Sequence, residues 1–266
     1  MYNKFKLLLT LLPTLWLQSW GQDTIYLAKP GSRPYLTVFK AEGQKTKTAV
    51  MICSGGSYGR TADGVEGIPA AMLLAQNGIT AFLLDYRLPE GNDSIPLIDA
   101  QACTRYIRAH GKFYGIEPDK IGAMGFSAGG HLVSTLETHF DRGSRPDFGV
   151  LVYPVISMTE ELTHHRSRVN LLGSNITPEN ISKYSNELQV TADTPPTFIV
   201  AAVDDGEVKV TNSLLFEAAL RQNGVPVEMF LYATGGHGFG ISNRAARMQW
   251  TDLAIPWITC EQWKRK

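Results

Sequence analysis

The sequence lacks an excess of charge of either sign. Its 266 residues contain 25 Lys and Arg and 25 Asp and Glu, so the formal net charge is zero. Neither a basic stripe nor an acidic tail is present. Proteins that bind nucleic acid or anionic surfaces usually concentrate charge in this way. We therefore expect neither nucleic acid nor an anionic surface as a partner.

Cysteine is also scarce, with only Cys53, Cys103 and Cys260. No C-x-x-C pair and no Cys/His spacing typical of a metal site occurs, so we expect neither a metal nor a cofactor. Cys53 ends an apolar run and is expected to pack as a small apolar side chain. The sequence leaves open whether Cys103 and Cys260 pair in a disulfide after export.

Long apolar runs are missing except at residues 7–17, where a run follows Lys4 and Lys6 and precedes the small residues Ser19 and Gly21. This order is typical of a secretory signal peptide, and the run is too short to span a bilayer comfortably.

We predict a signal peptide at residues 1–21 and a mature chain beginning near Gln22, secreted or periplasmic and free of the membrane. A retained amphipathic anchor is the alternative. A lipid anchor is not expected, because no cysteine lies near the predicted cut.

Beyond residue 21, neither internal repeats nor low-complexity linkers interrupt the chain, and short apolar runs alternate with helical patterns. The runs predict strands at 24–27, 35–39, 48–53, 79–84, 121–124, 148–152, 197–203 and 227–231. Helical spacing appears at 68–75, 96–110, 132–136, 214–222 and 242–257. Nearly continuous apolar strands alternating with helices predict an α/β domain over 22–266, with a mostly parallel sheet covered on both faces. The first two strands flank Pro30-Gly31 and should pair antiparallel.

One segment, 157–196, departs from this pattern. It is rich in Ser, Thr, Asn and His and carries only weak helical pieces. We interpret it as an insertion near the strand ends that forms one wall of a substrate cleft.

The motif Gly125-Phe126-Ser127-Ala128-Gly129 lies between an apolar run and a helical pattern. G-x-S-x-G in this context predicts a sharp strand-to-helix turn that presents the serine as a nucleophile above the sheet. Capping of the helix by Ser127 is the structural alternative.

A serine nucleophile needs a base and an acid that orients the base. In parallel sheets of this kind the acid and then the histidine follow the serine in the chain. Among the histidines only His237 follows a late acidic site, and it lies in a glycine-rich loop after the last strand. His131, His139, His164 and His165 are expected to pack, to cap a helix or to be solvated.

The acid should follow the strand at 197–203, where Asp204 and Asp205 both qualify and Glu207 is a distant third. We favour Asp205, because its place before the next helix lies within a loop, whereas Asp204 suits the strand end or a hydrogen bond to nearby backbone.

The oxyanion of an ester-cleavage intermediate needs preorganised N–H donors. We predict the backbone N–H of Ala128 and those of Gly56 and Ser57 in the loop after residue 53. An ordinary glycine turn is the alternative for that loop. Asp85-Tyr86-Arg87 is expected to be structural, with the arginine tying loops together.

These residues resemble the α/β-hydrolase esterases of the acetylxylan-esterase and feruloyl-esterase type, close to the hormone-sensitive-lipase-like esterases. The resemblance covers nearly all of the mature chain. It rests on the segments 54–58, 85–88, 125–131, 204–208 and 236–240. Two positions differ from the usual pattern, with Ser57 in place of a third glycine and Lys209 in place of a common proline.

The resemblance implies a secreted serine esterase that uses an acyl-enzyme and removes acetyl or feruloyl groups from plant polysaccharide such as xylan. The expected partner is therefore an acylated carbohydrate or polysaccharide. A general carboxylesterase or a peptidase on the same fold is the enzymatic alternative. An inactive carbohydrate-binding scaffold is the non-enzymatic one. Tyr58 and Trp250 either stack on sugar or pack in the core.

Overall fold

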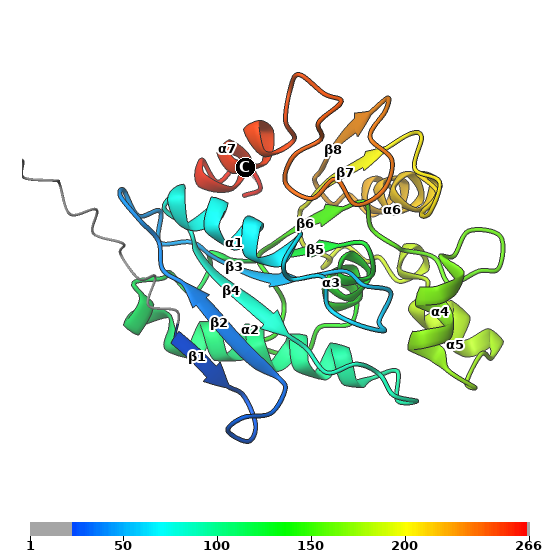
Figure 1. Cartoon of the computed structure of the whole chain (residues 1–266), viewed down its shortest axis with the longest axis horizontal. Coiled ribbons are helices and arrows are strands. Elements are labelled where there is room, and N and C mark those ends of the chain that lie inside the picture. The colour runs from blue at the N-terminus through cyan, green and yellow to red at the C-terminus, as the bar shows by residue number, and fades with distance from the viewer. Residues whose placement is uncertain (1–22, 265–266) are drawn as a thin grey trace, which may run out of the picture.

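A single twisted sheet organises the computed structural model, which describes residues 23–264 (Figure 1). Within them the sheet has eight strands in the order β1-β2-β4-β3-β5-β6-β7-β8. The strands are β1 (Asp23–Tyr26), β2 (Tyr35–Phe39), β3 (Ala49–Cys53), β4 (Thr80–Asp85), β5 (Ile121–Phe126), β6 (Phe148–Val152), β7 (Thr197–Ala202) and β8 (Val227–Tyr232). The predicted signal peptide lies outside the described residues.

Strand direction divides the sheet into two parts. β1 pairs antiparallel with β2, and β2 pairs antiparallel with β4. From β4 to β8 every neighbouring pair is parallel. The carboxyl ends of these strands therefore meet along one edge, where ligand sites of open α/β sheets form.

Helices cover both faces, as predicted. They are α1 (Gly67–Gln76), α2 (Ile95–Tyr114), α3 (Ala128–Thr138), α4 (His165–Leu172), α5 (Pro178–Tyr184), α6 (Thr211–Gln222) and α7 (Thr251–Thr259), with a 3₁₀ turn η1 (Asn186–Leu188). α2, α3 and α6 pack into the core on one face, and α1 and α7 into the core on the other. The sequence of β3 is apolar throughout because successive side chains face opposite cores. Met51 packs on the face covered by α2, α3 and α6, and Ile52 packs on the face covered by α1 and α7.

The predicted helix at 242–257 is wrong in its first half, because α7 begins only at Thr251. In residues 243–250, before α7, side chains accept hydrogen bonds from backbone N–H groups. The Asn243 N–H donates to Gln249 Oε1 over 2.8 Å, and the Trp250 N–H donates to the Tyr232 hydroxyl over 2.7 Å. Such local side-chain acceptors compete with helical hydrogen bonds.

The insertion at 157–196 folds into α4, α5 and η1, on the side of the sheet to which the β3 arrow points (Figure 1). Asn212 of α6 holds its start, since its Oδ1 accepts from the N–H groups of Ile156 and Ser157, both over 2.9 Å. Asn186 of η1 donates to the Ser134 hydroxyl on α3 over 2.7 Å. The insertion is therefore fastened to two core helices.

Cys103 and Cys260 do not pair. Both are free, with Cys103 buried and Cys260 exposed. Tyr58 and Trp250 are buried in the core, so neither offers a free face to a sugar. Within residues 23–264, helices of the length and apolarity needed to cross a bilayer are absent.

Candidate active site

Ser127 stands at a strained turn between β5 and α3. Its backbone has φ 51° and ψ −117°, a left-handed conformation uncommon for a residue with a side chain. A methyl group on Gly125 would lie 2.2 Å from the Gly129 oxygen, and one on Gly129 would lie 2.1 Å from the Cys53 oxygen. Only glycine fits at either position. The Ser127 hydroxyl does not cap α3, so the structural alternative for it is wrong.

The His237 ring connects Ser127 to Asp205. Its Nε2 lies 2.8 Å from Ser127 Oγ, and its Nδ1 lies 2.7 Å from Asp205 Oδ2. With the ring proton on Nδ1, His237 donates to Asp205 and accepts from the Ser127 hydroxyl. This arrangement allows a histidine to take a proton from an attacking serine.

Both carboxyl oxygens of Asp205 form hydrogen bonds. Its Oδ1 accepts from the N–H groups of Glu207 and Val208, both over 2.9 Å, and its side chain is 1% exposed. Burial alone would raise the pKa of Asp205. The hydrogen bonds from His237 and these N–H groups outweigh burial and lower the pKa of the Asp205 carboxyl below its ordinary value.

Asp204 points to different partners. Its Oδ1 accepts from the N–H groups of Gly235 and Gly236, over 2.9 and 2.8 Å. Asp204 therefore fastens the loop that carries His237 to the end of β7, while Asp205 contacts the ring itself. The two neighbours divide the positioning of His237 between them.

The loop after β3 lies against the serine turn. A methyl group on Gly55 would lie 2.9 Å from Ser127 Cβ. Gly56 has φ 119°, and Ser57 and Tyr58 both have φ 58°, so the chain turns sharply here. Within residues 23–264, the N–H groups of Gly56, Ser57 and Ala128 donate to no protein acceptor. These N–H groups can therefore donate to an anionic oxygen near Ser127.

Sequence reasoning missed the contacts that hold this loop. Asn170 of α4 donates to the Ser57 carbonyl over 2.7 Å, which joins the insertion to the loop. The Tyr58 hydroxyl lies 2.8 Å from Nδ1 of His131, whose Nε2 lies 2.8 Å from the Tyr184 carbonyl. Burial lowers the pKa of His131 to about 4, so its neutral ring accepts from Tyr58 and donates to Tyr184. No motif marks Asn170 in the sequence.

The sequence predicts that the adjacent His164 and His165 are solvated. His165 is exposed, as predicted, but His164 is not. His164 is half-buried at the start of α4, with Nδ1 2.8 Å from the Ser167 hydroxyl. Burial lowers the pKa of His164, and a positive charge on His237 would lower it further. The insertion therefore brings a second imidazole near His237. Arg87 is structural as expected, since its Nε donates to Asp99 over 3.1 Å.

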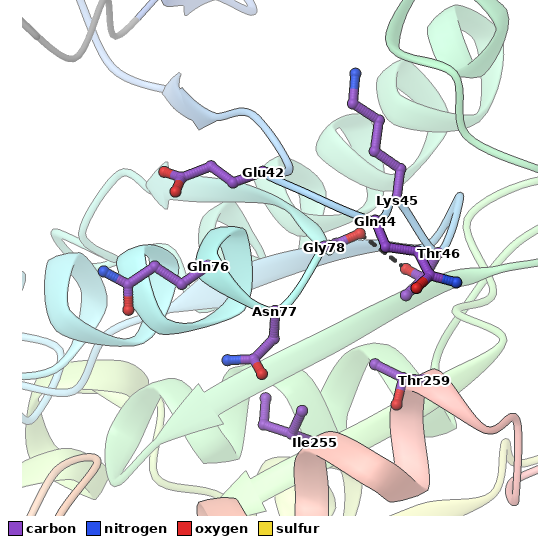
Figure 2. Close-up of a pocket in the computed structure, with 9 residues that line it drawn as sticks. All are labelled: Glu42, Gln44, Lys45, Thr46, Gln76, Asn77, Gly78, Ile255 and Thr259. Atoms are coloured by element: carbon purple, nitrogen blue, oxygen red, sulfur yellow. Dashed lines mark hydrogen bonds between the residues drawn. The ribbon is translucent and has the colours of Figure 1, made fainter.

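Two of the surface hollows among residues 23–264 lie at opposite ends of the sheet. One, of about 630 Å³, runs beside the His237 loop between Asp204, Phe239 and Arg244. The other, of about 490 Å³, is formed by the segment before β3, the end of α1 and α7 (Figure 2). It lies at the amino ends of the parallel strands, whereas Ser127 follows the carboxyl end of β5. The second hollow therefore belongs to no part of the serine site.

Comparison with known proteins places this geometry in a family. Residues 90–260 match the profile of the prolyl oligopeptidase family, and residues 36–143 match the profile named BD-FAE. An acetylxylan esterase of Xylanibacter ruminicola is 37% identical over 237 residues, covering 88% of this chain and 49% of the relative. The crystal structure of an acetyl ester-xyloside bifunctional hydrolase from Caldicellulosiruptor lactoaceticus superposes with a TM-score of 0.84 at 34% identity, covering 92% of this chain and 98% of that one. The chain belongs to the prolyl oligopeptidase family, and it resembles the α/β-hydrolase esterases of the acetylxylan-esterase type.

The family resemblance and the α/β-hydrolase fold predicted from the sequence are thus confirmed. This member of the family is also 34% identical over 233 residues to the endo-1,4-beta-xylanase B of Butyrivibrio fibrisolvens, covering 82% of this chain and 36% of that protein. This chain therefore spans about half the length, or less, of these two curated relatives.

Proposed function

We propose that this chain is a serine esterase that removes acetyl or related acyl groups from carbohydrate such as xylan. The observation that carries the proposal is the contact of His237 with Ser127 on one side and with Asp205 on the other. The relatives named for acetylxylan and for acetyl ester-xyloside hydrolysis support the substrate class.

In the proposed reaction, Ser127 Oγ attacks the ester carbonyl while its proton moves to His237 Nε2. The N–H groups of Ala128, Gly56 and Ser57 hold the oxyanion. As the bond to the sugar breaks, His237 gives the proton to the departing sugar oxygen, which leaves as a hydroxyl, and Ser127 remains acylated. A water molecule, deprotonated by His237, then attacks the acyl carbonyl. The acyl group leaves as a carboxylic acid, and His237 returns the proton to Ser127 Oγ. Asp205 keeps the proton on His237 Nδ1 throughout.

Ser127→Ala tests the proposal directly. We expect turnover of p-nitrophenyl acetate to fall by about 10⁴-fold or more, because the nucleophile is lost while the binding surface remains. Near-normal hydrolysis by the variant would refute the serine mechanism. A fluorophosphonate probe should label the wild type at Ser127, and absence of labelling would favour the inactive-scaffold alternative.

A peptidase or a general carboxylesterase remains the rival function, and the match to the prolyl oligopeptidase profile favours testing it. Acetate release from acetylated xylo-oligosaccharides should exceed cleavage of peptide and long-acyl esters when kcat/KM values are compared. Faster cleavage of prolyl peptides would reverse the assignment.

We also propose that residues 1–21 direct export and are removed. The charged, apolar and small-residue order at the N-terminus supports this. Protein isolated from its native host should begin near Gln22 on N-terminal sequencing, and a sequence beginning at Met1 would contradict export with cleavage.

A further inference from the structure

A buried carboxylate, Glu66, lies between the two loops that flank Ser127. Glu66 directly precedes α1 and is 5% exposed. Its Oε2 accepts from the Gly55 N–H over 2.6 Å, and its Oε1 accepts from the Tyr153 hydroxyl over 3.0 Å. Gly55 immediately precedes the loop residues that offer N–H groups to the oxyanion.

Tyr153 reaches the other side of the site. It follows β6 with the uncommon backbone φ of 38°. Its ring packs edge-on against the His237 ring, with 4.7 Å between centroids, and its hydroxyl accepts from the Gly240 N–H over 3.1 Å. One phenol therefore contacts both the His237 side chain and the loop that carries it.

The hydrogen bonds around Glu66 favour a negative charge on its carboxyl group. The Tyr153 oxygen accepts from Gly240, so its own proton is free to go to Glu66, and Gly55 also donates to Glu66. Both carboxyl oxygens thus face donors, an arrangement that favours the ionised form. Burial raises the pKa of the Glu66 carboxyl above its ordinary value, and the two hydrogen bonds partly oppose that rise.

Burying an ionised carboxylate costs stability unless it is well paired, and apolar replacements are often neutral or better for folding. Among residues 23–264, the hydrogen-bond donors to the Glu66 carboxylate are Gly55, at the loop after β3, and Tyr153, whose hydroxyl also contacts the His237 loop. The position of Glu66 is therefore explained better by the geometry of the site than by stability.

We propose that Glu66 and Tyr153 are positioning residues. They hold the oxyanion loop (residues 54–58) and the His237 loop (residues 235–240) in register around Ser127. The proposal rests on the esterase function proposed above. Neither residue reaches the reacting atoms; they act through Gly55 and His237. Displacement of a catalytic group by about 1 Å can lower turnover by about 10²-fold.

Tyr153→Phe and Glu66→Gln test the proposal, with Tyr232→Phe as the matched control. Tyr153→Phe keeps the ring contact with His237 and removes only the hydroxyl. A glutamine at position 66 has one acceptor oxygen for two donors. Tyr232 likewise has a buried hydroxyl that accepts from a backbone N–H, that of Trp250, over 2.7 Å.

With p-nitrophenyl acetate, we expect the two variants to lose about 10- to 100-fold in kcat with little change in KM, because oxyanion donors act mainly in the transition state. Affinity for a trifluoromethyl ketone inhibitor, which forms a tetrahedral adduct, should fall in proportion. Tyr232→Phe should stay within about twofold of the wild type.

The double variant Tyr153→Phe/Glu66→Gln should lose no more than the worse single variant, since both act through one network. Circular dichroism and active-site titration restrict each comparison to folded protein. Lower melting temperatures with wild-type kcat and inhibitor affinity would show a purely structural role and overturn the proposal. If the wild type itself hydrolyses no ester, the proposed function fails instead.

Discussion

Two adjacent aspartates show how the site is determined at the scale of single residues. Asp204 and Asp205 have the same chemistry and follow the same strand, yet Asp205 Oδ2 meets His237 while Asp204 Oδ1 meets the N–H groups of Gly235 and Gly236. The direction of each side chain, set by the chain's turn after β7, therefore separates an orienting acid from a loop anchor.

This difference predicts unequal effects of the same substitution. Asp205→Asn should lower kcat by about 10⁴-fold, because an amide facing Nδ1 favours the wrong tautomer of His237. Asp204→Asn keeps an Oδ1 acceptor for the two glycine N–H groups and should lose about tenfold or less. Steady-state kinetics with an aryl acetate measure both, and a larger loss for Asp204→Asn would reverse the assignment of the two residues.

The sequence allowed the residues within motifs to be predicted, but not the residues that hold them. Ser127 and His237 lie in glycine-rich segments whose spacing indicates a site. Glu66 directly precedes α1, Tyr153 directly follows β6, and Asn170 lies in α4, and each is a common residue type in an unremarkable local context. Their contacts depend on how distant elements pack, which local patterns do not encode.

At the scale of elements, α3 does more than follow the serine. His131, in its first turn, joins Tyr58 of the oxyanion loop to the Tyr184 carbonyl at the end of α5. The same helix is bound to η1 through Asn186. The insertion, the oxyanion loop and the serine turn are thus assembled on one buried helix.

This assembly should be sensitive to acid through His131. Its pKa is about 4 in the folded protein, against an ordinary value of 6.5. The unfolded chain therefore binds a proton below pH 6.5 that the folded chain accepts only near pH 4, so stability is lost as the pH falls through this window. The difference corresponds to about 3 kcal/mol.

His131→Gln removes this proton binding, so its free energy of unfolding relative to the wild type should improve by about 3 kcal/mol from pH 6.5 to 4. Urea unfolding at several pH values measures the difference. His165→Gln, at an exposed position of α4, is the control for loss of an imidazole. An unchanged gap between His131→Gln and the wild type across this range would contradict the assignment.

Prediction at the scale of elements succeeded where burial governs the sequence. The central strands are apolar on both faces, so their runs stood out, and the opening pair β1 and β2 followed from turn residues. Residues 242–250 failed for the opposite reason. Their apolar spacing resembles a helix, but side-chain groups of Asn243, Gln249 and Tyr232 form hydrogen bonds with the backbone instead.

At the scale of the whole molecule, the aromatic cluster at α7 and the serine site lie at opposite ends of the sheet. Ser127, Asp205 and His237 follow the carboxyl ends of β5, β7 and β8. The aromatic cluster under α7 lies near the amino ends, where Trp257 packs against Phe148 and Phe198, with ring centroids 5.8 and 5.7 Å away. Because the length of the sheet lies between the two regions, a substitution in the aromatic cluster should lower stability without lowering the catalytic rate.

Trp257→Ala should therefore destabilise the protein but leave the activity of the molecules that remain folded unchanged. Trp257 is 2% exposed, and truncation of such a buried aromatic side chain costs about 3–5 kcal/mol. Thermal unfolding should shift down markedly, while kcat measured well below the new midpoint stays within about twofold of the wild type. Phe113→Ala, at a side chain that is 79% exposed, should change neither quantity. A large fall in kcat for folded Trp257→Ala would mean that the α7 core also shapes the serine site, since rigid strands would then carry the displacement from one end of the sheet to the other.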